Sequence, residues 1–277
     1  MAGFQTMVIL ALDTTTRGGS VAVMRDDQLL ALVPGDAARS HSERLPGEFE
    51  AALTLAGRQR TDIDLLAVAT GPGAFTGLRI GLAAMQGLAM TLGRPVIGVS
   101  ALEALAAEAS TDGISLVAPW MDAQRGDVFA TLLDVSAGHT IAPPLAAHPS
   151  IVLEAWHVHL AGKPAVFIGD AVARDADLIT AAGSGQWIMR APPALAPAIG
   201  RLARSRAARG EGGLPHQLAP IYVRRPDVEI ERERAQGPEA VLAAIECHRC
   251  PWGAQPKCDR EWRELEGLTE RLGTRRR

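Results

Sequence analysis

The sequence predicts an α/β protein with two lobes, and three observations support this prediction. Short apolar runs at residues 7–12 and 65–69 are typical of strands that are buried on both faces of a sheet. The second run is followed by a glycine-containing turn, a helical pattern over residues 76–92 and another apolar run at 96–99, an order typical of a parallel sheet. A second set of strand patterns begins after residue 100, where we place the boundary between the lobes.

The composition is that of a folded globular chain. Of the 277 residues, 47% are apolar and 21% are charged, which excludes a largely disordered or fibrous protein. The net charge of −3 provides no basic field for binding nucleic acid unaided. No apolar run approaches the roughly 18–20 residues that span a bilayer, and no basic region precedes the first apolar stretch. We therefore expect a cytoplasmic protein without a signal peptide or membrane segment.

The first lobe, residues 1–100, is expected to contain two helices with unusually wide apolar faces. Its expected strands are residues 7–12, 20–24, 29–33, 65–69 and 96–99, and its expected helices are residues 43–56 and 76–92. Ser40 or Ser42 can cap the first helix, and Gly57 ends it. The apolar arc of this helix covers roughly 200°, and the second helix is apolar nearly all round, which is more than one contact with a sheet requires.

The second lobe, residues 101–192, is expected to be smaller. It should contain a short helix, strands at residues 115–120, 128–135 and 165–169, and a helix near 172–182. An Ala-rich helix over residues 194–209 lies in a segment, 193–226, that we expect to pack back on the first lobe. Residues 227–277 show no strand pattern and are expected to form a flexible tail.

One candidate phosphate loop is formed by Asp13, Thr14 and Thr15, directly after the first strand. Hydroxyl groups and backbone amides at such a turn can bind a phosphate, while the Asp carboxylate holds a cation-bound water. The alternative is that these side chains only close the turn through local hydrogen bonds.

A second candidate loop lies in the string TGPGAFTGLRIG and contains Gly71, Gly73 and Thr76. The glycines permit a tight turn from strand to helix, and we expect Thr76 to cap the helix. The loop contains no Lys and does not match GxGxxG, which excludes a Walker P-loop and a dinucleotide fingerprint.

Five strings resemble the TsaB (YeaZ) family in their order and spacing: DTTT, SVAV, RSHSERLP, GPGAFTGLRIG and PVIGVSALEALA. The resemblance covers about residues 7–226 and continues through MDAQRGDV and PIYVR. It implies the actin-like, Hsp70-like ATPase fold (ASKHA) with two ribonuclease-H-like lobes. It also implies a dimerisation subunit of the bacterial machinery that makes threonylcarbamoyladenosine on tRNA.

The resemblance further implies that this chain is not the catalyst. The catalytic paralogue, TsaD, carries two metal-binding histidines four residues apart on a helix, and this chain has Ala101 and Leu105 at the matching positions. Neither side chain can bind iron or zinc. The histidines are scattered and no HExxH motif occurs, so neither a metal site nor metalloprotease activity is expected. No cofactor is expected in this chain itself, while ATP or ADP binds at the complex and the partner holds the metal.

Members of the family pair through the two helices of the first lobe. The implied partner interface consists of Leu45, Phe49, Leu53, Leu78, Leu82 and Met85. The implied assembly is a heterodimer with TsaD that recruits the small ATPase TsaE and binds tRNA only through the complex. It modifies adenosine 37 of ANN-decoding tRNAs. We expect Met85→Arg or Leu53→Arg to abolish partner binding in a folded protein, unless both helices are buried within this chain.

Two other functions stay open. The chain could be a stand-alone ATP-dependent phosphotransferase of the same fold, with residues 13–15 as its phosphate loop. It could also be a self-associating regulatory homodimer, because the same apolar helices could pair with a second copy.

Two smaller clusters each have a simple structural explanation. Asp122, Arg125 and Asp127 fit a salt-bridged turn, with a role at a subunit or nucleotide groove as the alternative. A zinc site usually needs a second ligand pair beyond one CxxC. We therefore expect reduced thiols in the tail rather than a zinc site at Cys247, His248, Cys250 and Cys258.

Overall fold

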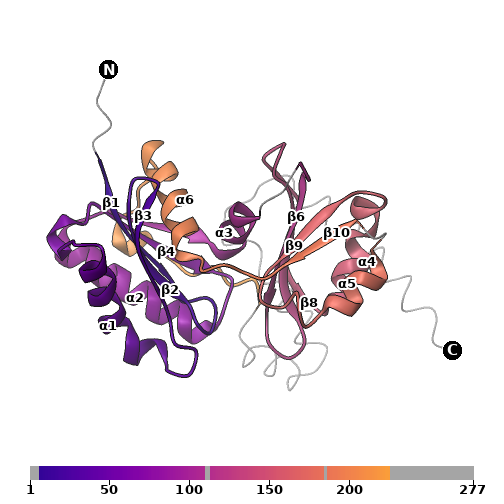
Figure 1. Ribbon diagram of the computed structural model, residues 1–277, viewed down its shortest axis with the longest axis horizontal. Coiled ribbons are helices and arrows are strands. Elements are labelled where there is room, and N and C mark those ends of the chain that lie inside the picture. Colours follow the sequence, from indigo (N-terminus) through magenta and orange to yellow (C-terminus); the bar gives the residue numbers. More distant parts are fainter. Residues whose placement is uncertain (1–5, 110–112, 184–185, 225–277) are drawn as a thin grey trace, which may run out of the picture. The chain divides into compact units, whose positions relative to one another are not determined.

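The computed structural model describes residues 6–109, 113–183 and 186–224, which contain two five-stranded sheets (Figure 1). The strand order is β3-β2-β1-β4-β5 in the first sheet and β10-β9-β6-β7-β8 in the second. In each sheet a central strand, β1 or β6, has an antiparallel neighbour on one side and a parallel neighbour on the other. The two sheets therefore repeat one topology, which confirms the α/β fold with two ribonuclease-H-like lobes.

The first sheet is covered by helices on both faces (Figure 1). Its strands are β1 (Val8–Asp13), β2 (Ser20–Arg25), β3 (Gln28–Pro34), β4 (Leu65–Gly71) and β5 (Val96–Ser100). The helices α1 (His41–Leu55) and α2 (Phe75–Leu92) cover one face, and α6 (Ala196–Ala208) covers the other. A 3-10 turn, Arg60–Asp62, follows α1.

The alternation of side chains along β1 explains why this strand is buried on both faces. Leu10 and Leu12 belong to the apolar cluster beneath α1 and α2. Ile9 and Ala11 belong to the opposite cluster, which includes Ile199 of α6. Successive side chains of a strand point to opposite faces, so a sheet covered on both sides requires the continuous apolar run seen in the sequence.

The α6 helix is attached to the first sheet by polar contacts as well as by its apolar face. The backbone amide of Ala196 donates to Ser20 Oγ over 3.1 Å. Arg204 pairs with Asp27 over 2.8 Å, and Arg206 donates to the carbonyl of Gly98 over 2.6 Å. The chain thus returns from the second lobe to complete the first.

The RSHSERLP string has a structural explanation at the start of α1. Ser40 is the N-cap, and its backbone amide donates to the Glu43 carboxylate over 3.1 Å. Arg44 is buried, pairs with Glu48 over 2.5 Å and donates to the carbonyl of Gly18. This guanidinium therefore ties α1 to the turn between β1 and β2.

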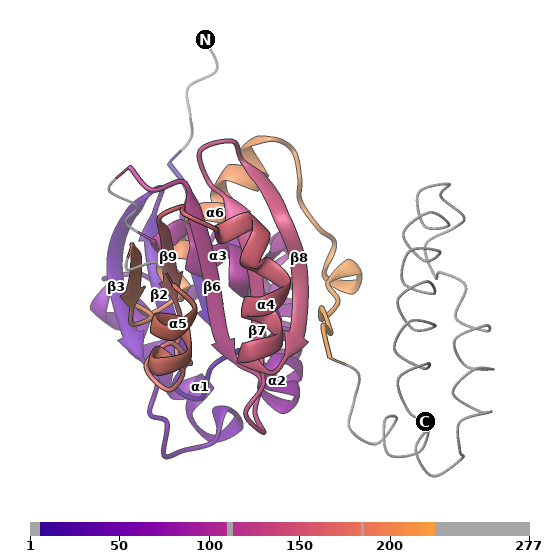
Figure 2. The ribbon, with the colours of Figure 1, turned by 90° about the vertical axis from the view of Figure 1, so that its right-hand side faces the viewer.

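The second lobe contains elements that the sequence patterns missed. Its strands and helices are α3 (Ala101–Glu108), β6 (Leu116–Asp122), β7 (Val128–Asp134), β8 (His139–Ala147), α4 (Pro149–Leu160), β9 (Ala165–Ile168), α5 (Ala176–Ala182) and β10 (Trp187–Arg190). The patterns did not indicate β8, α4 or β10, and α5 begins four residues later than expected. Figure 2 shows α4 and α5 in front of the second sheet, where they share its apolar core.

A 3-10 turn, Pro215–Gln217, follows α6 and contacts α2. The Gln86 side chain of α2 donates to the carbonyls of Pro215 and Leu218. Within the residues that the structure describes, no helix is long and apolar enough to cross a membrane. Cys247, His248, Cys250 and Cys258 lie outside the described residues.

Candidate functional site

The first candidate phosphate loop is a closed, buried turn. Asp13 accepts hydrogen bonds from the Thr15 amide over 2.8 Å and from the Thr15 hydroxyl over 2.6 Å, and the Thr16 hydroxyl lies 3.4 Å from the same carboxylate. Asp13, Thr14 and Thr15 are all buried. This arrangement favours the simpler explanation, in which local hydrogen bonds close the turn.

The second candidate loop packs directly on the first and fills the space beside it. A Cβ added to Gly73 would lie 2.6 Å from the Thr15 side chain. A Cβ added to Gly81 would lie 2.2 Å from Thr14 Oγ1, which has no hydrogen-bond partner in the described structure. The glycines of this string therefore bring α2 against the β1–β2 turn, and the threonine side chains face protein.

The remaining two members of the candidate nucleotide loops are Thr76 and Gly71. Ala74, not Thr76, is the N-cap of α2, so the capping prediction is wrong; Thr76 lies inside the first turn and is exposed. Gly71 has a φ of 116°, and an added Cβ would lie 2.7 Å from the carbonyl oxygen of Ile221. Because Gly71 has no side chain, the segment that follows α6 can pack closely against it.

The buried carboxylate of Asp13, at the end of β1, is influenced by Asp170, an exposed residue in the loop after β9. Burial raises the pKa of Asp13, and the charge of Asp170 adds to this effect. Partial desolvation of its carboxylate likewise raises the pKa of Asp170, with a contribution from the charge of Asp122. Asp170 accepts a hydrogen bond from the Asp122 backbone amide over 2.9 Å.

The charged cluster at residues 122–127 is mainly an ion-pair network. Arg174 pairs with Asp122 over 2.6 Å and with Asp175 over 2.7 Å, and Asp127 lies 3.5 Å from Arg224. Asp175 also accepts a hydrogen bond from the indole of Trp120 over 2.8 Å. Asp122 and Asp127 thus pair with arginines from other segments, Arg174 and Arg224, so the ion pairs extend beyond the turn that the sequence suggested.

Ala101 and Leu105, which the resemblance places at the positions of the paralogue's metal-binding histidines, are core side chains. Ala101 and Leu105 lie on α3 and are 0% and 1% exposed. Both belong to the apolar cluster that joins α3, α6 and the two sheets. Among the described residues, no group of three or more His, Cys, Asp or Glu side chains is placed to hold a metal ion.

Most of the expected interface residues belong to this chain's own core, which corrects the residue-level prediction. Five of the six are 4% exposed or less: Leu45, Leu53, Leu78, Leu82 and Met85. Only Phe49 is partly exposed. The physical reason is that these side chains form the faces of α1 and α2 that cover the first sheet. A second protein that bound these helices would have to contact their other faces.

Those outer faces contain a groove between α1 and α2. It has a volume of about 330 Å³, and its exposed lining includes Ala83, Gly87 and Thr91 of α2. Glu50 of α1 lies at the groove and accepts a hydrogen bond from Arg60 Nε over 2.8 Å. The small residues allow a helix of another molecule to approach α2 closely.

Two apolar residues of α1 and α2 that are not part of the groove lining are unusually accessible. Met90 is 75% exposed on α2, and Leu55 is 68% exposed at the end of α1. Ala83, Gly87 and Met90 are absent from the interface predicted from the sequence, because that prediction consists of large apolar side chains. The signal that could have found them is the spacing of Ala83 and Gly87, which lie four residues apart and therefore on one face of α2.

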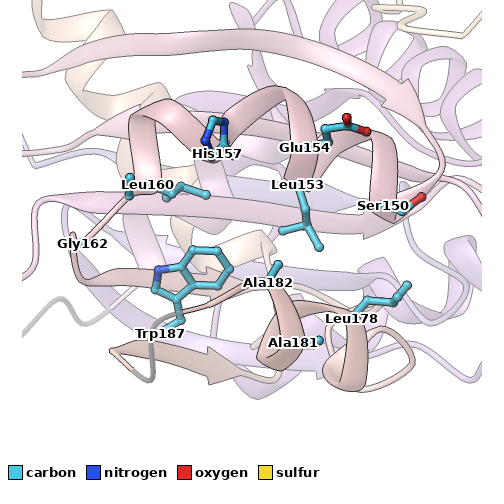
Figure 3. A pocket seen from close by; sticks show the side chains of 11 residues that line it. Ser150, Leu153, Glu154, His157, Leu160, Gly162, Leu178, Ala181, Ala182 and Trp187 are labelled. Atoms are coloured by element: carbon cyan, nitrogen blue, oxygen red, sulfur yellow. The ribbon is translucent and has the colours of Figure 1, made fainter.

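A second cavity lies in the other lobe, between α4 and α5. It has a volume of about 640 Å³ and a mainly apolar lining, with Glu154 and His157 as its titratable residues. Figure 3 shows Leu153 of α4 and Trp187 of β10 turned toward this space. The Trp187 indole donates to the carbonyl of Lys163 over 3.2 Å.

Comparisons with known proteins give consistent relatives. The family model described as TsaD, tRNA N6-adenosine threonylcarbamoyltransferase, matches residues 29–144. The Escherichia coli tRNA threonylcarbamoyladenosine biosynthesis protein TsaB is 41% identical over 127 residues, which cover 44% of this chain and 53% of that protein. TsaB of Bacillus subtilis is 32% identical over 166 residues, which cover 59% of this chain and 71% of that protein.

A solved structure shares the fold over most of this chain. It is an uncharacterised Pseudomonas aeruginosa protein described as similar to the peptidase YeaZ, with 30% sequence identity and a TM-score of 0.66. The match covers 79% of this chain and 100% of that one. The alignments thus span about half of the E. coli protein and more than two thirds of the B. subtilis protein.

Proposed function

Because this chain belongs to the TsaB (YeaZ) family, we propose that it is a non-catalytic dimerisation subunit for threonylcarbamoyladenosine synthesis on tRNA. The proposed partner is the catalytic homologue TsaD, which supplies the metal site. The chain acts by holding the partner in a competent conformation, so that the threonylcarbamoyl group is transferred to adenosine 37 of ANN-decoding tRNAs.

The observation that carries this proposal is the exposed outer face of α1 and α2. A helix pair whose inner face already covers the sheet leaves Leu55 and Met90 accessible on the same helices that line a groove with small residues. Exposed apolar side chains around a groove are typical of a surface that binds another protein. A partner helix lying over Ala83 and Gly87 would bury this surface.

The non-catalytic role is supported by the chemistry at α3. Ala101 and Leu105 offer no metal ligand, and both side chains contribute to the core. The closed turn at residues 13–15 argues against an independent phosphotransferase, because Thr14 and Thr15 are buried under α2. We assign the metal to TsaD, ATP or ADP binding to the complex, recruitment of the small ATPase TsaE to the heterodimer, and tRNA contact to the complex as a whole.

A self-associating homodimer is the second candidate, because the same groove can accept α2 of another copy. Size-exclusion chromatography with light scattering separates the two. The chain is measured alone over a range of concentrations and after mixing with TsaD of the same organism. A one-to-one heterodimer that replaces any homodimer is the expected result. A homodimer that persists unchanged, or ATP turnover by the isolated chain, would contradict the proposal.

A further inference from the structure

Phe75, Arg79 and Tyr222 form a compact aromatic–guanidinium cluster at the start of α2. The rings of Phe75 and Tyr222 are 5.3 Å apart and tilted by 31°. The Arg79 guanidinium carbon lies 3.8 Å from the Phe75 ring centroid, and Arg79 Nε donates to the Tyr222 hydroxyl over 3.1 Å. The stacked guanidinium is held at its Nε end, so its orientation is fixed before any partner binds.

The segment that carries Tyr222 is anchored to the first sheet. The backbone amide of Ile221 donates to the Thr70 carbonyl over 2.7 Å, and Gly71 lacks the Cβ that would collide with the Ile221 carbonyl. These contacts join positions about 150 residues apart in the sequence. They fix Tyr222 against Phe75 although Tyr222 is 41% exposed and Phe75 is 40% exposed.

The charge of Arg79 is left without a counter-ion inside the described structure. Its contacts in the described structure are the Phe75 ring and the Tyr222 hydroxyl, and no described carboxylate pairs with it. The first turn of α2 contains no acidic residue, so the positive end of the helix dipole adds to this positive potential. A preorganised, unpaired guanidinium of this kind matches a carboxylate in a bidentate geometry.

The cluster is continuous with the groove face of α2. Phe75, Arg79, Ala83 and Gly87 follow one another at intervals of four residues, and all four are exposed. Residues spaced by four lie along one side of a helix. A partner helix lying over Ala83 and Gly87 would therefore reach Arg79 when extended toward the start of α2.

We propose that this cluster is an anchor for an acidic side chain of the protein partner, with Arg79 as the residue that binds its carboxylate. The inference rests on the proposed function and adds to it the charge of the partner segment at this end of the interface. Arg, Tyr and Phe are enriched at protein interfaces, where Arg and Tyr often contribute most of the affinity.

A protein carboxylate fits the cluster better than RNA does. Arg79 and Tyr222 already pack against the Phe75 ring, which makes the ring a poor platform for stacking a base. The net charge of −3 also disfavours an independent contact with a polyanion.

The test compares binding of full-length variants to TsaD of the same organism by calorimetry at low and high salt. Arg79→Glu should raise the Kd by about tenfold or more, because it places like charges together. Arg79→Gln should raise it less and should reduce its salt dependence. Arg25→Glu is the matched control, since Arg25 is exposed on β2 and its hydrogen bond is to Gln28. Thermal melting checks that each variant is folded.

Each outcome has a distinct meaning. If the wild-type chain does not bind TsaD, the proposed function fails and this inference falls with it. If the wild-type chain binds and Arg79→Glu binds equally well, the proposed function stands and the inference is overturned. If Arg79→Glu leaves the protein complex intact but weakens retention of tRNA by that complex, the cluster contacts RNA and the carboxylate assignment is wrong. Compensation of Arg79→Glu by an acidic-to-basic change in TsaD would identify the carboxylate.

Discussion

Gly87→Gln should stabilise the isolated chain and weaken its binding to the partner. Gly87 lies in the interior of α2, is exposed, and an added Cβ would meet no atom within 4 Å. Replacing an exposed helical Gly with a good helix former is worth about 0.5–1 kcal/mol. For a chain of this size that corresponds to a rise in Tm of about 1–4 °C.

The same side chain would occupy the groove between α1 and α2, which has a volume of about 330 Å³. Overpacking a closely fitted contact typically costs about 1–3 kcal/mol, which corresponds to a Kd roughly 5- to 150-fold higher. Circular dichroism melting measures the first effect, and calorimetry with TsaD measures the second. Opposite signs in the two assays distinguish a blocked interface from general destabilisation.

Gly47→Gln is the matched control for helix propensity. Gly47 lies inside α1, is exposed, has no atom within 4 Å of an added Cβ, and is not part of the groove lining. It should give a similar rise in Tm without the loss of binding. The reasoning would be refuted if Gly87→Gln bound TsaD as tightly as the wild type, or if it melted at a lower temperature.

Three further predictions concern the core and the buried turn. Met85→Arg should destabilise the chain by about 4 kcal/mol or more, because it buries a charge in the first lobe. Met90→Arg, at an exposed position, should leave the Tm within about 2 °C and weaken partner binding. Equal melting temperatures of the two variants would contradict the burial argument. Gly81→Ala should lower the free energy of urea unfolding by about 1–3 kcal/mol, because the added Cβ collides with Thr14 Oγ1. Adding Thr14→Ala should recover part of that loss. Strictly additive effects of the two substitutions would contradict the contact. Because burial raises the pKa of Asp13, its contribution to stability is present at low pH and is lost as the pH rises through the folded-state pKa. Asp13→Asn should therefore flatten the pH dependence of the unfolding free energy over this range. Parallel pH curves for the two proteins would contradict the raised pKa of Asp13.

The regular parts of the first lobe could be predicted because each carries a local signal. The continuous apolar run of β1 reflects a sheet covered on both faces, and Ser40 caps α1 through local chemistry. The elements missed in the second lobe lack such signals. β8 contains Pro143 and Pro144, which argue against a strand but are tolerated at the edge of a sheet.

The site was predictable at the level of helices but not of residues. Periodicity identifies α1 and α2 as apolar on too many faces, yet it does not say which face covers the sheet. Met85 was therefore assigned to the interface although it is fully buried, while the exposed Met90 and Gly87 were overlooked. The contact of Arg79 with Tyr222 joins residues 143 positions apart, and no local pattern encodes it.

The most direct test of the proposed scaffold role is threonylcarbamoyl incorporation into tRNA by purified components. The reaction contains the adenylate-forming enzyme, TsaD, TsaE, ATP, threonine and bicarbonate, with wild-type chain, with Gly87→Gln, or with no added chain. The proposal predicts modified tRNA with the wild type, a strong reduction with Gly87→Gln at limiting protein, and no product when the chain is omitted. Equal product with and without the chain would contradict the proposal.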